Sequence, residues 1–146
     1  MVMKNRKKIL IISLTLLVSF TCAAGTVTKG MKKVIDDALN FSVKQSMSMF
    51  YEMKDQKGIL PRTAENGKMI TCESAWWTSG FYPGTLWYCY EYSNDPQIRA
   101  AAEEMTSRVE KQKYTTSNHD VGFIINCSFG NGYRPVSYTH LRAHET

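Results

Sequence analysis

The sequence predicts an all-α chain built from αα-hairpins, that is, from antiparallel helix pairs. Apolar residues recur at spacings of three and four along residues 31–51, as they do on one face of an amphipathic helix. A helix stop and restart at 93–96 then separates two further helical segments. Alternation of the kind that marks strands is weak, and 146 residues is the length of a single domain.

Residues 1–24 are predicted to be a signal peptide and are set apart from the fold. A basic start is followed by an apolar run, Ile9 to Phe20, that is too short to span a bilayer comfortably, and then by small residues. We therefore expect export to the periplasm of a Gram-negative bacterium, without a membrane span. Cys22 lies where a lipoprotein signal carries its lipid, but Ser19 stands where leucine is usual. An outer-membrane lipid anchor and soluble release both stay open.

The first helix is predicted from Met31 to near Gly58, with Leu60-Pro61 forming an extended exit. Its apolar face consists of Met31, Val34, Ile35, Leu39, Val43, Met47, Phe50 and Tyr51. The methionines at 47, 49 and 53 are soft ligands that could bind a metal. We expect them to fill gaps in the core instead, because methionine packs irregular spaces well.

Residues 61–84 are rich in turn formers and are predicted to form a long loop, with a short extended piece at Lys68 to Cys72. Long loops inside compact domains are often functional. This one contains Trp76 and Trp77, and aromatic planes suit the C–H faces of sugar rings. Plain packing in a core is the alternative, and it is weaker for Trp77.

Two helices are predicted next, from Gly84 to Tyr92 and from Pro96 to Lys113, with Asp95 as the N-cap of the second. The side chains expected inside are Leu86, Cys89, Tyr90, Ile98, Ala101, Ala102, Met105 and Val109. The side chains expected on the solvated face of the second helix are Glu103, Glu104, Arg108 and Lys111.

The stretch "SNHDVGF" places His119 and Asp120 directly before an apolar run. A carboxylate in such a place must be paired, hydrogen-bonded or protonated. From the residues alone, Asp120 is either an N-cap or a functional acid. The following tract, 121–130, fits a short strand or the start of another helix.

Several kinds of site lack support in the sequence. The net charge of +5 includes basic residues of the signal, and no basic patch interleaved with aromatics predicts nucleic-acid binding. Cys72, Cys89 and Cys127 are odd in number and lack C-x-x-C spacing, so one disulfide is possible and zinc is not expected. His140 and His144 lack a third ligand. We predict no metal and no cofactor.

Three ordered segments, "WWTSGFYPGTLWYCYEY", "NDPQIRAAAEE" and "SNHDVGF", resemble glycoside hydrolase family 88, the unsaturated glucuronyl hydrolases, over residues 31–134. The resemblance implies a partial (α/α)6 toroid, with 25–134 as its N-terminal part. It also implies a substrate, an oligosaccharide left by a polysaccharide lyase, whose terminal uronic acid carries a C4=C5 double bond. Proton delivery to C4 and addition of water at C5 then release the sugar.

The resemblance also assigns roles to residues. Asp120 matches one of the two essential aspartates, Trp77 matches the tryptophan of the cleft, and His119 is expected to bind substrate or to orient the carboxyl group. Two departures stand out. The second aspartate of the family lies on a later helix and has no match after Arg134, and twelve helices need a chain several times longer. The expectation is a truncated, inactive fragment.

Residues 135–146, "PVSYTHLRAHET", do not continue the family pattern and are predicted to be a non-native tail. Two alternative functions remain. One is an unsaturated rhamnogalacturonyl hydrolase of similar fold and chemistry. The other is an exported helical protein that binds sugar without catalysis.

Overall fold

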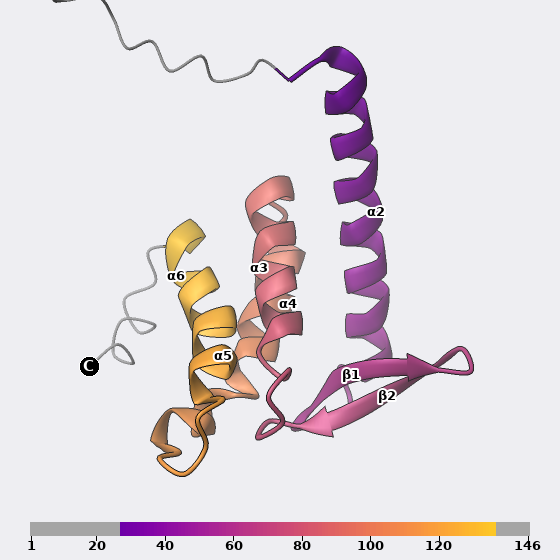
Figure 1. Cartoon of the computed structure of the whole chain (residues 1–146). Helices are drawn as coiled ribbons and strands as arrows, with labels where there is room; N and C mark the ends of the chain where they lie inside the picture. Colours follow the sequence, from indigo (N-terminus) through magenta and orange to yellow (C-terminus); the bar gives the residue numbers. More distant parts are fainter. Residues whose placement is uncertain (1–26, 137–146) are drawn as a thin grey trace, which may run out of the picture. The chain divides into compact units, whose positions relative to one another are not determined.

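In the computed structural model, residues 27–136 are described. The chain divides into two compact units, Met1–Lys32 and Lys33–Thr146. Its elements in chain order (Figure 1) are α2 (Lys29–Met53, which begins in the first unit), β1 (Ile59–Glu65), β2 (Lys68–Glu73), α3 (Phe81–Ser93), α4 (Pro96–Ser107), the 3₁₀ turn η1 (Glu110–Tyr114), α5 (Val121–Ile125), the π-helical turn η2 (Asn126–Gly130) and α6 (Asn131–Val136). The predicted helical fold is confirmed. The predicted signal at 1–24 and the tail residues 137–146, with His140 and His144, lie outside the described residues.

The helices α3 and α4 form the predicted αα-hairpin. Asn94 ends α3 in a left-handed conformation, and its N–H donates to the carbonyl of Tyr90 at 2.7 Å. Asp95 then caps α4, because its carboxylate accepts a hydrogen bond from the N–H of Gln97 at 2.8 Å. The helices begin and end a few residues from the predicted limits, since α3 starts at Phe81 and α4 gives way to η1 after Ser107.

The prediction of a loop for residues 61–84 is wrong in its first half, where β1 and β2 form an antiparallel hairpin. The turn is Asn66-Gly67, and both residues have positive φ angles, 50° and 72°. Such a pair is a strong hairpin signal. The hairpin is not predicted because Pro61 lies in β1, and proline argues against a strand unless the strand lies at the edge of a sheet. In a two-stranded hairpin both strands are edges, so Pro61 pairs with Thr71 without loss. The extended piece expected at Lys68 to Cys72 is confirmed as β2.

Two clusters of buried side chains hold the unit together. The larger joins α2, α3 and α4 and contains Met53, Tyr82, Leu86, Trp87, Ala101, Ala102 and Met105. The smaller joins the hairpin to the C-terminal helices and contains Leu60, Val109, Ile124 and Phe129. Met47 and Met49 pack against the larger cluster, so the prediction that the methionines fill the core is confirmed.

The predicted inner face of α2 is only partly buried. Met47 and Phe50, near its C-terminal end, pack against the core. In contrast, Val34 and Ile35 are 63% and 41% exposed, so the apolar face of the helix is uncovered at these positions. The helix itself ends at Met53, five residues before Gly58.

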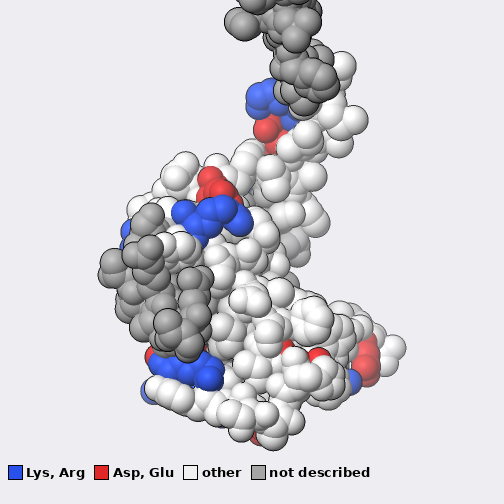
Figure 2. Space-filling model, turned by 60° about the vertical axis from the view of Figure 1, so that its left-hand side comes forward, with Lys and Arg blue, Asp and Glu red and all other residues white. Residues whose placement is uncertain are grey.

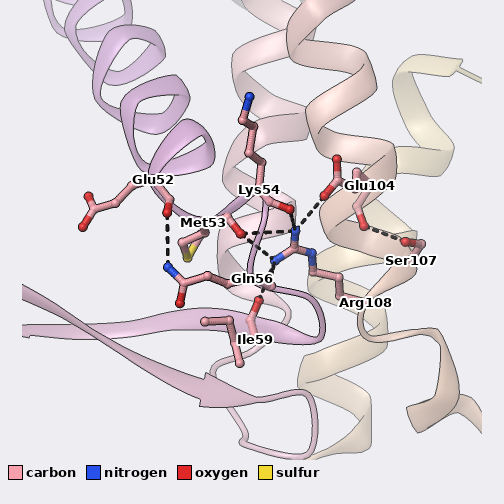
Figure 3. A network of polar contacts seen from close by, with 8 residues as sticks. All are labelled: Glu52, Met53, Lys54, Gln56, Ile59, Glu104, Ser107 and Arg108. Atoms are coloured by element: carbon pink, nitrogen blue, oxygen red, sulfur yellow. Dashed lines mark hydrogen bonds and ion pairs between the residues drawn. The ribbon is translucent and has the colours of Figure 1, made fainter.

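Arg108 does not lie on a solvated face, and this prediction is also wrong. Its side chain is only 6% exposed, and its guanidinium donates to the carbonyls of Lys54, Gln56 and Ile59 at 3.1, 2.9 and 3.0 Å (Figure 3). It also pairs with Glu104 at 2.6 Å. The last carbonyls of a helix have no partner within it. Arg108 supplies a donor to the carbonyl of Met53, the last residue of α2, at 3.4 Å, and its other backbone partners lie in the chain that leads from α2 into β1.

Residues 121–136 form one continuous helical segment, so the strand alternative for 121–130 is wrong. The segment packs very closely on α3. A β-carbon added to Gly84 would overlap the carbonyl of Cys127, and one added to Gly132 would lie 2.6 Å from Cε2 of Trp87. Glycine fits both positions because the space for a β-carbon is taken, by backbone at Gly84 and by the buried ring of Trp87 at Gly132.

Candidate functional site

Asp120 precedes α5 but does not cap it. Its φ and ψ angles, −76° and −6°, are helical, and its carboxylate makes no hydrogen bond to the first turn of the helix. Its own N–H donates to the side chain of Asn118 at 2.9 Å, which fixes the backbone before the helix. The side chain is 27% exposed. The structure thus argues against the N-cap alternative and leaves this carboxylate available for other contacts.

His119 lies beside that carboxylate and points into solvent. Its Nε2 is 3.3 Å from Oδ1 of Asp120, while its side chain is 93% exposed. A histidine in this position can orient the carboxylate and still present an edge of its ring to a ligand. The two side chains of the motif are thus brought together as one polar pair.

Trp77 lies in the turn between β2 and α3 and is 44% exposed. Its ring meets Phe81 edge to face, with centroids 5.7 Å apart and planes at 89°. Phe81 is itself 39% exposed, so the two rings form a surface rather than a plug in the core. Sequence reasoning missed Phe81, although it lies four residues after Trp77 in the same motif. Trp76 is 38% exposed and carries the guanidinium of Arg62 on its face.

The turn that carries the tryptophans is rigidly tied to the segment before Asp120. The N–H of Ser79 donates to the carbonyl of Trp76 at 2.9 Å, and Oγ of Ser79 donates to the carbonyl of Ser74 at 2.7 Å. The buried side chain of Gln112 in η1 donates to Oγ of Ser74 at 2.8 Å. This bond joins the turn to the chain that leads into His119 and Asp120.

Gly80 makes the second link between these two parts. A β-carbon at Gly80 would overlap the backbone of Ile124, whose N–H donates to the carbonyl of Asp120 at 3.1 Å. The turn with Trp77 therefore lies against the first turn of α5, and Asp120 begins that turn. Within the described part of the chain, no hydrogen bond joins Trp77 to Asp120. The structure places them on neighbouring, rigidly packed elements rather than in contact.

The thiols of this region are unsuited to nucleophilic chemistry. Cys72, Cys89 and Cys127 are all free, so the disulfide left open by the sequence does not form among them. Burial raises the pKa of each thiol, with Arg62 partly opposing the shift for Cys72 and a hydrogen bond to Ser46 opposing it for Cys89. A thiol with a raised pKa is mostly protonated, and the protonated form is a poor nucleophile.

On the face drawn in Figure 2, basic and acidic side chains form small separate groups with wide uncharged surface between them. Among residues 27–136, no three histidine, cysteine or acidic side chains are grouped as metal ligands, and no helix is long and apolar enough to cross a bilayer. An open concavity of about 350 Å³ between Ser107 and Tyr114 contains none of the predicted site residues.

The known proteins that are similar to this chain are hydrolases that act on unsaturated sugars, by their names. No model of a known protein family matches the chain. An unsaturated glucuronyl hydrolase of Formosa agariphila is 45% identical over 58 residues, which are 40% of this chain and 14% of that protein. An unsaturated chondroitin disaccharide hydrolase of Streptococcus pyogenes is 34% identical over 99 residues, 64% of this chain and 24% of that one. The chain spans only 14% to 24% of the length of these curated relatives.

Solved structures agree with the sequence matches. An unsaturated glucuronyl hydrolase specific for heparin superposes with a TM-score of 0.63 at 33% identity, over 75% of this chain and 30% of its own. The unsaturated glucuronyl hydrolase of Streptococcus agalactiae superposes with a TM-score of 0.58 at 22% identity, over 73% of this chain and 28% of its own. At this level of identity, the match supports the fold alone. Over the matched part, the chain has the helical arrangement of the toroid of these hydrolases and is similar to them in sequence.

Proposed function

We propose that the protein containing this chain is a glycoside hydrolase that hydrates the C4=C5 double bond of an unsaturated uronic acid at the non-reducing end of lyase-generated oligosaccharides. The main support is the carboxylate of Asp120, which makes no capping bond and lies beside the exposed His119. The partial similarity to unsaturated glucuronyl hydrolases supports the same substrate class.

In this reaction a proton bonds to C4 and the oxygen of water bonds to C5, which gives a hemiketal. The hemiketal opens to a ketone at C5, which leaves the former ring oxygen as a hydroxyl group on C1. The resulting hemiacetal collapses to an aldehyde at C1, and the glycosidic oxygen leaves with the proton as the hydroxyl of the released sugar. Each proton transfer needs a positioned acid or base. The distance rule for paired glycosidase carboxylates does not apply, because no group attacks the anomeric carbon.

Each site residue has a role in this proposal. Asp120 handles protons at the double bond, and His119 orients its carboxylate or hydrogen-bonds the substrate. The exposed ring of Trp77, held against Phe81, forms a stacking wall for the unsaturated sugar. The family resemblance puts a second aspartate on a later helix, and we therefore expect activity only in a protein that includes that helix. The 146-residue chain by itself is expected to be inactive.

The test uses the protein expressed from its full gene. Addition of a lyase-generated unsaturated disaccharide is expected to cause loss of the ultraviolet absorbance of the double bond, and Asp120→Asn is expected to abolish the loss. A parallel assay with an unsaturated rhamnogalacturonyl disaccharide separates the related activity. Absence of any absorbance change with both substrates, or full activity of Asp120→Asn, contradicts the proposal.

A non-catalytic, exported sugar-binding protein is the second candidate, favoured by the exposure of both tryptophans. It predicts saccharide binding that depends on Trp76 and Trp77 and is indifferent to Asp120.

We also propose export, from residues 1–24, with the lipid anchor at Cys22 still open. Labelling the expressed protein with a radioactive fatty acid, with Cys22→Ala as control, decides between anchored and soluble forms.

A further inference from the structure

Arg62 lies at an irregularity of the β-hairpin. Pro61 pairs with Thr71 and Thr63 pairs with Ile70, so Arg62 is the extra residue of a β-bulge. A bulge redirects the side chain of its extra residue, and bulges are common beside active sites. Here the Arg62 guanidinium lies over the indole of Trp76, with its Cζ 4.1 Å from the ring centroid.

The stack leaves the hydrogen-bonding edges of the guanidinium unused. A cation–π contact occupies only the flat face, whereas the N–H donors point outward in the guanidinium plane. Arg62 is exposed, and it makes no ion pair or side-chain hydrogen bond with the residues that the structure describes. Its positive charge thus lies against the Trp76 ring, and no carboxylate among residues 27–136 pairs with it.

This charge lies next to the proposed site. Trp76 directly precedes Trp77, and the hydrogen bond from Ser79 to the Trp76 carbonyl fixes the turn that contains both rings. Gly80 then packs the same turn on the backbone of Ile124, in the helix that Asp120 begins. Trp77 and the Trp76–Arg62 stack are therefore carried by adjacent residues of one turn, and both tryptophan rings are exposed.

We propose that Arg62 is a specificity-determining residue that binds an oxyanion, a sulfate or a carboxylate, on the sugar next to the unsaturated one. The inference rests on the proposed function and adds a preference for anionic oligosaccharides. Guanidinium groups recognise such oxyanions through paired hydrogen bonds, and the Trp76 stack holds the group ready for them.

The kinetic test uses the protein expressed from its full gene and three unsaturated disaccharides, whose second sugar is neutral, sulfated or carboxylated. Arg62→Ala is expected to lower kcat/KM on an anionic substrate about tenfold relative to the neutral one, through KM rather than kcat. The anionic substrate that is affected identifies the group that binds. Arg62→Lys is expected to be intermediate, because it keeps the charge but loses the paired donors.

Lys68→Ala is the matched control, because it removes one exposed positive charge from the neighbouring strand. It is expected to leave the ratio of anionic to neutral kcat/KM unchanged. An equal effect of Arg62→Ala on all three substrates, or a fall in the ratio with Lys68→Ala as large as with Arg62→Ala, overturns the inference.

Binding to the Asp120→Asn variant, measured by calorimetry with the same disaccharides, separates this inference from the proposed function. If no substrate is hydrated but the anionic disaccharides still bind more tightly, and Arg62→Ala removes that preference, the inference about Arg62 holds and the hydrolase proposal fails. If substrates are hydrated without any anionic preference, the hydrolase proposal holds and the inference about Arg62 fails. If none of the disaccharides is hydrated and none binds, both are wrong.

Discussion

Gly80 lies so close to Ile124 that an added β-carbon would overlap the carbonyl group of Ile124. This contact joins the turn that carries Trp77 to the helix that begins after Asp120. The position of the aromatic wall relative to the carboxylate therefore depends on the absence of a side chain at residue 80.

Gly80→Ala is expected to destabilise the fold by about 2–3 kcal/mol, because backbone, not a flexible side chain, would have to move. Urea denaturation measures the change. Gly122→Ala is the control, since a β-carbon there meets nothing within 4 Å. Gly122 lies inside α5, so alanine is expected to be neutral or to stabilise by up to about 1 kcal/mol. Equal destabilisation by both would rule out the close contact as the cause.

In the protein expressed from its full gene, Asp120→Ala is expected to reduce kcat by a factor of about 10²–10⁴ while changing the free energy of unfolding by less than about 0.5 kcal/mol. Asp95→Ala provides the comparison, because Asp95 does cap its helix. It is expected to lose about 1 kcal/mol of stability and to retain activity. If instead Asp120→Ala loses as much stability as Asp95→Ala, its carboxylate is a cap.

Arg108→Met is expected to destabilise the fold by about 2–4 kcal/mol, because several backbone carbonyls between the end of α2 and the start of β1 lose their donors. Lys33→Ala breaks an ion pair whose side chains are 77% and 66% exposed and is expected to have almost no effect. Thermal unfolding of both variants checks the contrast. A small effect of Arg108→Met would mean that water replaces the guanidinium at little cost.

Stability is expected to fall in alkaline solution. Burial raises the pKa of Cys89 above its ordinary value of 9.0, so the folded protein holds this proton more tightly than the unfolded chain. The resulting stabilisation is fully present below 9.0 and is lost as the pH rises through the folded-state pKa. Urea midpoints measured from neutral pH upward should decline less steeply in Cys89→Ala. An identical decline would assign the effect to other groups, among them Tyr82, whose pKa burial also raises.

Trp77→Ala is expected to raise KM about tenfold with a smaller effect on kcat, because a stacking surface contributes mainly to binding. Tyr114→Ala serves as the control, since Tyr114 is an aromatic side chain that is 77% exposed and is not among the proposed site residues. Steady-state kinetics on one unsaturated disaccharide would test the pair. An unchanged KM in Trp77→Ala would remove this ring from the site.

Local signals predict much of the fold. Features that depend on neighbours within a few residues can be predicted from the sequence. They include the spacing of apolar residues in α2, the cap at Asp95 and the buried positions of α4. The hairpin escapes prediction because Pro61 weakens the strand signal. The burial of Arg108 is not predicted because its partners follow α2, about 50 residues earlier in the chain. The close contact of Gly80 is not predicted because Ile124 is also distant in the sequence.

The candidate site divides in the same way. His119 and Asp120 are adjacent in the sequence, so their pairing is predictable. The contact of Trp76 with Arg62 depends on a bulge whose register no local pattern reveals. That the Asp120 carboxylate makes no cap follows from its backbone angles, and these cannot be read from residue types.

The π-helical turn at Asn126–Gly130 sets the rotational phase of α6, the helix directly after it. A π turn holds about one residue more than an α turn, and each residue of an α-helix advances the chain by roughly 100° around its axis. Deleting one residue from this turn would rotate Gly132 away from Trp87 and carry Arg134 off its partner Glu91, now bound at 2.6 Å. The loop lengths on either side would be untouched, yet the two ends of the segment would no longer face the same neighbours.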